Sequence, residues 1–405
     1  MPILSEICLE LKARFAHLDS VTRYLLLFVL NFVVSGVLTF CLNWMAAIPW
    51  RKASAAHWTE RARLLWPVRV AGGVNILLIP ACLSVAEFET GLVSFSGSVI
   101  PAVAGFLGAI LATFPLDREI LPRFTFRSWL RLVLRSWAIR AGFLGVLVAC
   151  AILMPAEPGL AMVGIGGGLL FYILALHFGF YVWLLRCLGM LLPPGERLRG
   201  IVARTAERMV VRQPATWLLD MPLAQAFAMP MTGELMFSSR LLDIESDEEI
   251  SAICAHELAH LMESRGVLAG RIAGSLTLYP VIFLRPAATF GPSAVCAIFG
   301  LVWLAAIFTR KLSRRMEKRA DKIAAENQGE AGVYAHALER LYSDGLIPAV
   351  NPKNNKMHPH LYDRMLAAGI QPEYPRPSKP EKMAWSGYVV CIALGVLIGI
   401  ALAKL

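Results

Sequence analysis

The sequence predicts a mainly α-helical fold: a polytopic membrane protein with about eight spans and a small polar α+β domain. Three observations support this. Of the 405 residues, 57% are hydrophobic and 17% are charged, with a mean hydropathy of +0.58, whereas about a quarter of a soluble chain is charged. The apolar residues gather in runs near the length of about 20 residues that crosses a bilayer. The remaining polar residues concentrate in two segments late in the chain.

Eight apolar runs are candidate spans, five before residue 192 and three after residue 266. The second and fourth runs are marginal, because they are short or carry Arg69 or Arg140 near an end, where a long stem can reach the interface. The first run lacks a small-residue cleavage site, so we expect a retained helix. The eight runs are 24–48, 70–85, 91–114, 137–154, 160–185, 267–284, 287–308 and 385–403.

Basic residues alternate between the loops that join the first runs. The first loop carries Arg51, Lys52, Arg61 and Arg63, and the third carries five arginines, whereas the second and fourth carry only glutamates. By the positive-inside rule the first and third loops are cytoplasmic, and so is the polar segment that begins after Leu192. The net charge of +10 therefore reflects topology, and we expect no nucleic-acid partner.

The chain divides into five segments on this basis. Residues 1–192 are the N-terminal membrane region with about five spans, and residues 383–405 are the C-terminal span. Residues 193–266 and 309–382 are two parts of one catalytic domain, separated by the membrane helical pair at 267–308. The eight cysteines are scattered without a CxxC pair, which makes a disulfide framework or a cysteine-based zinc site improbable.

The first polar segment contains a short hairpin pattern followed by a helix start. Strand-like runs at 225–229 and 234–238 flank Pro230-Met231-Thr232-Gly233, which is typical of a turn. Ser246 with Glu249 three residues later forms a capping box. We therefore expect a helix that begins in water rather than in the membrane.

That helix carries the HExxH motif His256-Glu257-Leu258-Ala259-His260. Residues four apart share one helical face, so both imidazoles can reach one metal ion, while Glu257 faces a water bound to it. The alternative is a surface helix with two incidental histidines. The sequence favours a catalytic zinc site.

A third protein ligand is required, since a catalytic zinc site usually has three and keeps a position for water. Glu317 is the candidate, because Asp321 lies one helical turn later and can accept a hydrogen bond from a ligating imidazole. A plain pair of surface carboxylates is the alternative, and Glu263 is expected to be uninvolved. Two apolar runs separate His260 from Glu317, and two crossings with a turn at Arg285-Pro286 return the chain to the same face. A re-entrant pair of helices would also return it.

Taken in order, these elements resemble the zinc metallopeptidase family of the type I CAAX prenyl protease and the HtpX-type heat-shock membrane protease, which are gluzincins. The resemblance rests on HELAH at 256–260, two apolar segments, Glu317 to Asp321 in place of an ExxxD element, and residues 357–364 in place of a late HPxxxxR element. It covers about residues 197–364. The family's hairpin begins with Asn-Ala-Phe-Ala, where this chain has Gln225 in place of the asparagine.

The resemblance implies a zincin-type metalloprotease domain with one Zn²⁺ per chain, held by His256, His260 and Glu317. Glu257 would take a proton from water and return it to the leaving amine. His358 or Arg364 would steady the oxyanion, or would instead support the loop. An extended peptide would add to the hairpin at the substrate-binding residues Gln225, Ala226, Phe227 and Ala228.

The expected function is a membrane-embedded, zinc-dependent endopeptidase that cleaves membrane-associated or membrane proteins at the cytoplasmic face. The expected location is a bacterial cytoplasmic (inner) membrane, and the expected partners are a peptide or protein substrate and the lipid bilayer. Two alternatives remain open. One is a catalytically silent scaffold or chaperone with a structural zinc, and the other is a site-2-type intramembrane metalloprotease.

Overall fold

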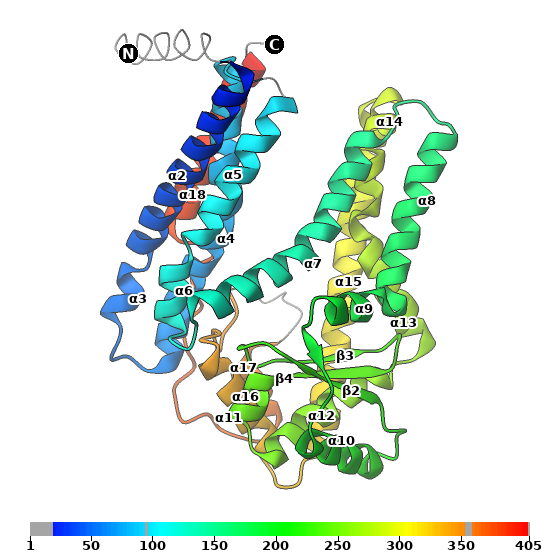
Figure 1. Ribbon diagram of the computed structural model, residues 1–405. Helices are drawn as coiled ribbons and strands as arrows, with labels where there is room; N and C mark the ends of the chain where they lie inside the picture. The colour runs from blue at the N-terminus through cyan, green and yellow to red at the C-terminus, as the bar shows by residue number, and fades with distance from the viewer. Residues whose placement is uncertain (1–18, 94–95, 353–358, 404–405) are drawn as a thin grey trace. The chain divides into compact units, whose positions relative to one another are not determined.

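The computed structural model describes residues 19–93, 96–352 and 359–403, and these residues form two compact units (Figure 1). The first unit takes the residues up to Phe126, residues 346–348 and those from Pro377 onward. The second takes residues 127–345 and 349–376. Each unit contains long helices, and the small sheet belongs to the second unit.

The first unit is a bundle of apolar helices in which α2 packs closely on α5. A Cβ at Gly108 would lie 2.0 Å from the carbonyl oxygen of Phe32, so glycine is required for this approach. Amide side chains join the helices inside the bundle, and Asn75 donates to Asn43 at 2.8 Å, as polar residues do in membrane bundles. The elements are α2 (Ser20–Ala46), α3 (Ile48–Lys52), α4 (Trp58–Glu89), η1 (Ser96–Ser98), α5 (Val99–Leu111), α6 (Phe114–Ile120) and α18 (Trp385–Ala403).

The second unit has long helices at one end and the sheet with shorter helices at the other (Figure 1). The longest helix, α15, runs continuously from an apolar beginning into the polar segment that carries Glu317. The long-helix end comprises α7 (Phe126–Leu153), α8 (Leu160–Ala175), the π-helical segment η2 (Leu176–Phe180), α9 (Tyr181–Cys187), α13 (Arg265–Ser275), η3 (Leu276–Phe283), α14 (Leu284–Thr289) and α15 (Pro292–Glu326).

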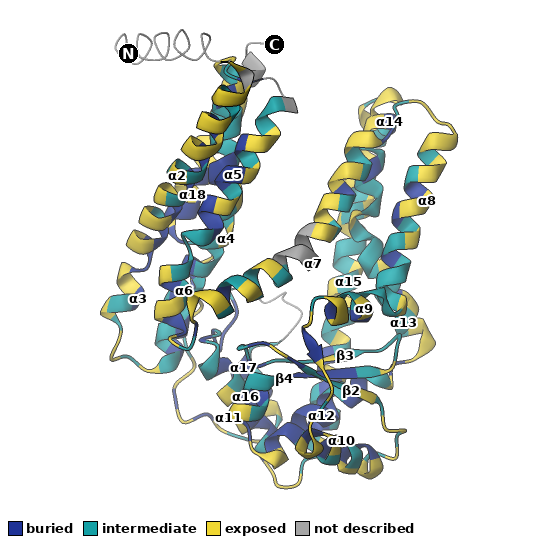
Figure 2. Cartoon of the chain, in the orientation of Figure 1, coloured by how far each residue is buried: buried dark blue, intermediate teal, exposed yellow. Residues whose placement is uncertain are grey.

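Six helices in the described part of the chain are long and apolar enough to cross a membrane. Their exposed faces carry large apolar side chains such as Val29, Val33 and Val163, which Figure 2 shows as yellow stretches along α2 and α8. Such faces suit a lipid environment. Two shorter apolar helices, Gly142–Leu153 and Trp385–Ile400, fall on the runs predicted at 137–154 and 385–403. The number of spans stays a prediction.

The turn between the two apolar runs after the HExxH motif differs from our expectation. Arg285 and Pro286 lie inside α14, and the chain reverses at Phe290-Gly291. Gly291 adopts a φ of +92°, which glycine tolerates because it has no Cβ, and Pro292 then begins α15 with its φ already suited to a helix. The predicted turn at Arg285-Pro286 was therefore wrong, although α13 and η3 do pack against α15 as a hairpin.

A four-stranded sheet in the order β1-β2-β4-β3 supports the polar part of the second unit. Strands β3 (Ala226–Met229) and β4 (Glu234–Ser238) are antiparallel, with Ala226 opposite Phe237, which confirms the predicted hairpin. Strand β2 (Ala215–Leu219) pairs parallel to β4, and β1 (Leu191–Leu192) pairs antiparallel to β2; neither was predicted. The helices are α10 (Glu196–Arg208), α11 (Ser239–Ile244), α12 (Asp247–Leu261), α16 (Val333–Asp344) and α17 (Leu361–Ala367).

Helix α12 packs against one face of this sheet and begins at the predicted capping box. The Ser246 hydroxyl accepts a bond from the Glu249 backbone, and the Glu249 carboxylate accepts one from the Ser246 backbone at 2.8 Å. Ile250, Ile253 and Leu258 on α12 bury themselves in a core that also contains Leu235 and Phe237 of β4. The helix that carries the HExxH motif is thus fixed by packing on the sheet.

Candidate metal site

The three side chains predicted to bind metal lie together between α12 and α15. His256 and His260 come from one face of α12, and Glu317 comes from the polar part of α15. Each is less than a tenth exposed. Each offers one ligand atom, and these three atoms lie within 4.8 Å of one another.

Both histidines direct Nε2 toward the same carboxylate. His256 Nε2 lies 3.6 Å from Glu317 Oε2, and His260 Nε2 lies 3.6 Å from Glu317 Oε1. The two rings are nearly perpendicular, with centroids 5.0 Å apart. Two imidazole nitrogens and one carboxylate oxygen are the donor set that a catalytic zinc ion takes with a further position left for water. The residues present therefore fit the metal that the sequence indicates.

Tyr334 and Asp321 hold His256 through its other nitrogen. The Tyr334 hydroxyl lies 2.8 Å from His256 Nδ1 and donates to Asp321 Oδ1 at 2.7 Å. Burial raises the pKa of Tyr334 well above its usual value, so the phenol keeps its single proton. Since that proton goes to Asp321, Nδ1 of His256 is the donor to the tyrosine oxygen, and Nε2 is the ring nitrogen that faces Glu317.

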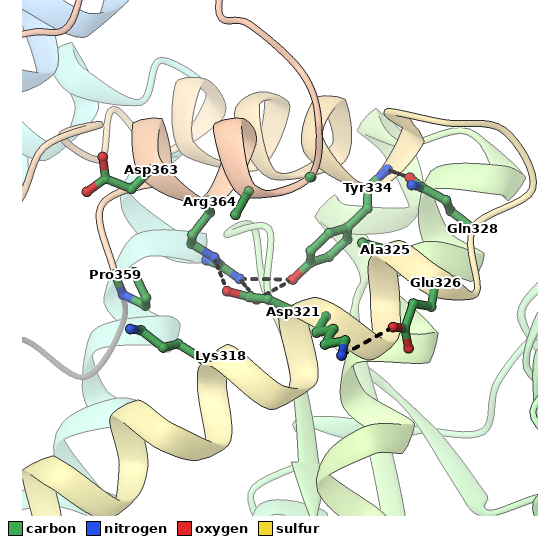
Figure 3. A pocket seen from close by; sticks show the side chains of 12 residues that line it. Lys318, Asp321, Ala325, Glu326, Gln328, Tyr334, Pro359, Asp363 and Arg364 are labelled. Atoms are coloured by element: carbon green, nitrogen blue, oxygen red, sulfur yellow. Dashed lines mark hydrogen bonds and ion pairs between the residues drawn. The ribbon is translucent and has the colours of Figure 1, made fainter.

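Arg364 holds Asp321 and Tyr334 in turn (Figure 3). Its Nε donates to Asp321 Oδ2 at 2.9 Å, and a terminal nitrogen donates to the Tyr334 hydroxyl at 2.9 Å. The Arg364 side chain is almost fully buried. Burial alone would lower the pKa of Arg364, but the neighbouring Tyr334 and Asp321 keep that pKa well above its usual value. The guanidinium is therefore committed to Asp321 and Tyr334.

A separate set of contacts holds His260. Its Nδ1 lies 2.8 Å from Glu263 Oε1, and the Arg271 guanidinium binds the same carboxylate. The Glu263 side chain is fully buried; burial alone would raise its pKa, but the hydrogen bonds from His260 and Arg271 hold that pKa below its usual value. We had expected Glu263 to be uninvolved, yet it lies three residues after His260, a helical spacing that could have indicated this contact.

The electrostatics of the site favour positive charge on His256 when no metal is bound. Burial disfavours the imidazolium, but the hydrogen bonds to Asp321 and Glu317 outweigh it and raise the pKa of His256 to about 9. A metal ligand must be a neutral imidazole. The same carboxylates that attract a proton are thus arranged to attract a divalent cation in its place.

The remaining predicted residues lie nearby or outside the described chain. Glu257 is half-buried on α12 between the two histidines. Gln225 immediately precedes β3, where its backbone nitrogen donates to the Ser238 hydroxyl at 2.9 Å. Residues 226–228 form most of β3, the strand at the end of the sheet order. His358 lies outside the described residues.

Comparison with known proteins agrees with this geometry. Residues 194–369 match the model of peptidase family M48. The chain is 28% identical over 235 residues to a protease HtpX homologue of Desulfatibacillum aliphaticivorans, which covers 47% of this chain and 75% of that protein. It is 27% identical over 259 residues to a protease HtpX homologue of Pelotomaculum thermopropionicum, covering 56% of this chain and 88% of that protein.

A shorter match is more similar in sequence. A protease HtpX homologue of Bordetella avium is 33% identical over 135 residues, which is 29% of this chain and 45% of that protein. The family match begins in the first polar segment, includes the helical pair and ends in the second polar segment at residue 369. It therefore contains His256, His260 and Glu317. Through residues 194–369, the chain is assigned to peptidase family M48 as a metalloprotease of the HtpX type with membrane helices.

Proposed function

We propose that the protein is a zinc-dependent endopeptidase that cleaves membrane or membrane-associated proteins at the cytoplasmic face of a bacterial inner membrane. The convergence of His256, His260 and Glu317 carries the proposal, because both imidazoles are held at Nδ1 and present Nε2 to one carboxylate. Such support from outside the ligand set raises ligand basicity and fixes ring orientation. The cytoplasmic placement is supported by the basic segments 51–63 and 118–135, which flank apolar helices.

Glu257 is the group that moves protons in this proposal. It adjoins His256 on α12, and its partial exposure leaves the carboxylate accessible to water and peptide. A zinc ion held by the three ligands would lower the pKa of a water molecule and polarise the scissile carbonyl. Glu257 would accept a proton from the attacking water at a carboxylate oxygen while the water oxygen bonds to the scissile carbon, and would deliver that proton to the leaving nitrogen as the C–N bond breaks.

The edge of β3 is the proposed place for the substrate backbone. No described strand pairs with the outer edge of β3, so its backbone groups can pair with an extended peptide. Residues 225–228 would contribute to that pairing, and β3 contacts α12, which carries the catalytic residues. Backbone pairing of this kind aligns a peptide with little demand on its sequence.

Arg364 is proposed as a positioning residue rather than an oxyanion donor. Its guanidinium bonds Asp321 and Tyr334, the two groups that contact His256 Nδ1. The sequence left two roles open for Arg364, steadying the oxyanion or holding the loop in place. These contacts favour the second role. For the same reason Asp321 is proposed as the support of a ligand rather than as a ligand.

The other two functions find less support in the geometry. A site-2-type enzyme has its HExxH within a span, whereas α12 begins at Asp247, Glu248 and Glu249 and packs on the sheet. A silent scaffold with a structural zinc would be served by a closed set of four ligands, whereas three converging ligands and an adjacent glutamate suit catalysis.

Glu257→Gln tests the proposal. The variant should retain one zinc per chain, measured by metal analysis of the purified protein in lipid nanodiscs, and should lose at least about a hundredfold in peptide cleavage. His260→Ala is the matched change on the same helix and should lose zinc as well as cleavage. Cleavage at the wild-type rate by Glu257→Gln would refute the proposed role, and retention of zinc by His260→Ala would refute the ligand set.

A further inference from the structure

A cavity of about 340 Å³ lies beside the edge strand, on the sheet face away from the HExxH helix. Side chains alternate along β3. Ala226 and Ala228 pack against the core that includes α12, whereas Phe227 and Met229 line the cavity, which Ala228 also borders. Strand β3 therefore separates two faces: one toward the catalytic helix, the other toward this cavity.

The lining of the cavity is mostly apolar and rich in flexible side chains. Among the residues that the structure describes, four methionines line it, Met190, Met221, Met229 and Met236, and no charged residue does. Methionine side chains are flexible and polarizable and adjust to partners of different shape. The cavity thus suits apolar side chains in general more than one particular side chain.

Phe227 lies where the cavity side of β3 is exposed. Its side chain is 41% exposed although it lies on a strand beside the buried Met236, its partner on β4. An exposed aromatic ring at an unpaired strand edge is an apolar surface that another strand can cover. The opposite wall of the cavity includes Tyr181 and Leu185 of α9, at the end of the candidate span Leu160–Cys187.

We propose that this cavity is a side-chain subsite: it takes an apolar side chain of the peptide paired to β3, from a hydrophobic segment of a membrane protein. The inference rests on the proposed function, because it requires an extended peptide at the β3 edge. In such a peptide alternate side chains face opposite sides of the sheet. One set therefore points toward the α12 face and the other set toward the methionines.

Two variants in the full-length protein test the subsite. Met229→Glu places a carboxylate in the lining, and Met231→Glu is its matched control, since Met231 is a partly buried methionine of the same hairpin that does not line the cavity. The substrates are ten-residue alanine-based peptides with a guest Ala, Leu, Phe, Lys or Asp scanned through successive positions. The readout is kcat/KM for each guest relative to alanine, with the protein in nanodiscs.

The wild-type protein should prefer Leu and Phe over Ala by about tenfold at alternate positions of the peptide. Met229→Glu should abolish that preference and improve the Lys guest, while Met231→Glu should keep the wild-type ratios. Ser136→Leu, which fills the cavity from α7, provides a second test that leaves the hairpin intact. It should reduce the ratio of kcat/KM for the Leu and Phe guests to that for the Ala guest.

The outcomes separate this inference from the function on which it rests. Unchanged guest ratios in both Met229→Glu and Ser136→Leu, with cleavage that still depends on Glu257, would overturn the subsite alone. A zinc-loaded wild-type protein that cleaves no peptide of the series would overturn the proposed function and the subsite with it.

Discussion

The two units of this chain bury polar side chains in different ways. In the first unit amide side chains make the buried polar contacts between helices: Asn75 donates to Asn43, and Asn31 donates to the Glu87 carboxyl group. In the second unit ionised groups surround the metal ligands, with Arg364 on Asp321 and Arg271 on Glu263. Neutral amides suit contacts between helices in a bilayer, where burying a charge is costly.

The two units use different buried contacts because one has to hold helices together and the other has to hold metal ligands in place. Helix contacts need only a donor and an acceptor that are both satisfied. A metal site needs histidine rings held in one tautomer and one orientation, and charged partners do this most strongly because charge-assisted hydrogen bonds are about twice as strong as neutral ones. We therefore expect larger effects from changes around the metal ligands than from changes in the bundle.

Loss of the Arg364 guanidinium should give the largest effect on stability. Arg364→Leu leaves Asp321 buried beside Tyr334 without its cation, and breaking a buried ion pair costs about 3–5 kcal/mol. The measurement is the free energy of unfolding of the purified protein in detergent micelles. The Arg364→Leu variant should also bind zinc more weakly, because Asp321 and Tyr334 position His256.

Arg376→Leu is the control for that change. Arg376 binds Asp363, the residue next to Arg364 on α17, with two hydrogen bonds. Both side chains of this pair are about half exposed. An exposed pair contributes about 0–1 kcal/mol. Equal costs for the two substitutions would show that burial of the Arg364 pair does not set its contribution.

Zinc affinity should fall as the pH is lowered below about 9. The metal-free site raises the pKa of His256 to about 9, so below that pH zinc must displace a proton to bind. One displaced proton weakens binding about tenfold per pH unit, which is about 2.7 kcal/mol between pH 8 and pH 6. Zinc titration of the metal-free protein at several pH values measures this slope, and a flat profile from pH 6 to 8 would contradict a charged His256.

Patterns local in sequence predicted the site better than they predicted its surroundings. The capping box at Ser246, the hairpin around Thr232 and the spacing of His256 and His260 are each set within a few residues, and the structure contains each of these elements. Glu317 was chosen as the third ligand because Asp321 lies one helical turn later, and counting membrane crossings showed that the chain could bring Glu317 back to the histidines. These features depend on helix and turn periodicity, which a single sequence displays directly.

The missed features depend on contacts between distant residues. Tyr334 reaches His256 across 78 positions, and nothing near Tyr334 in the sequence distinguishes it from a core tyrosine. Strand β2 pairs with β4 in parallel, and such a pairing leaves no turn signal between the strands. The turn at Gly291 was predicted at Pro286, because a proline inside an apolar run usually indicates a break. In the structure Pro286 lies within α14, directly after the 3₁₀ segment η3, and the chain does not turn there.

Within the first unit, close helix packing should matter more than its polar contacts. Gly108→Ala would bring a Cβ against the backbone of Phe32, and such overpacking costs about 1–3 kcal/mol. Gly73→Ala is the control, because a Cβ at that helical position meets nothing within 4 Å and should be neutral or stabilising. Unfolding in detergent micelles measures both, and a neutral Gly108→Ala would indicate that α2 and α5 can separate without loss.

The smallest effect should come from the amide pair inside the bundle. Asn75 donates to Asn43 at 2.8 Å, and a hydrogen bond between membrane helices contributes about 0.6 kcal/mol on average. A double-mutant cycle with Asn43→Ala and Asn75→Ala isolates the coupling between the two side chains. A coupling above about 2 kcal/mol would place this neutral pair level with the charged contacts around the metal site. The contrast between the units would then lie in charge alone and not in the strength with which each holds its buried polar groups.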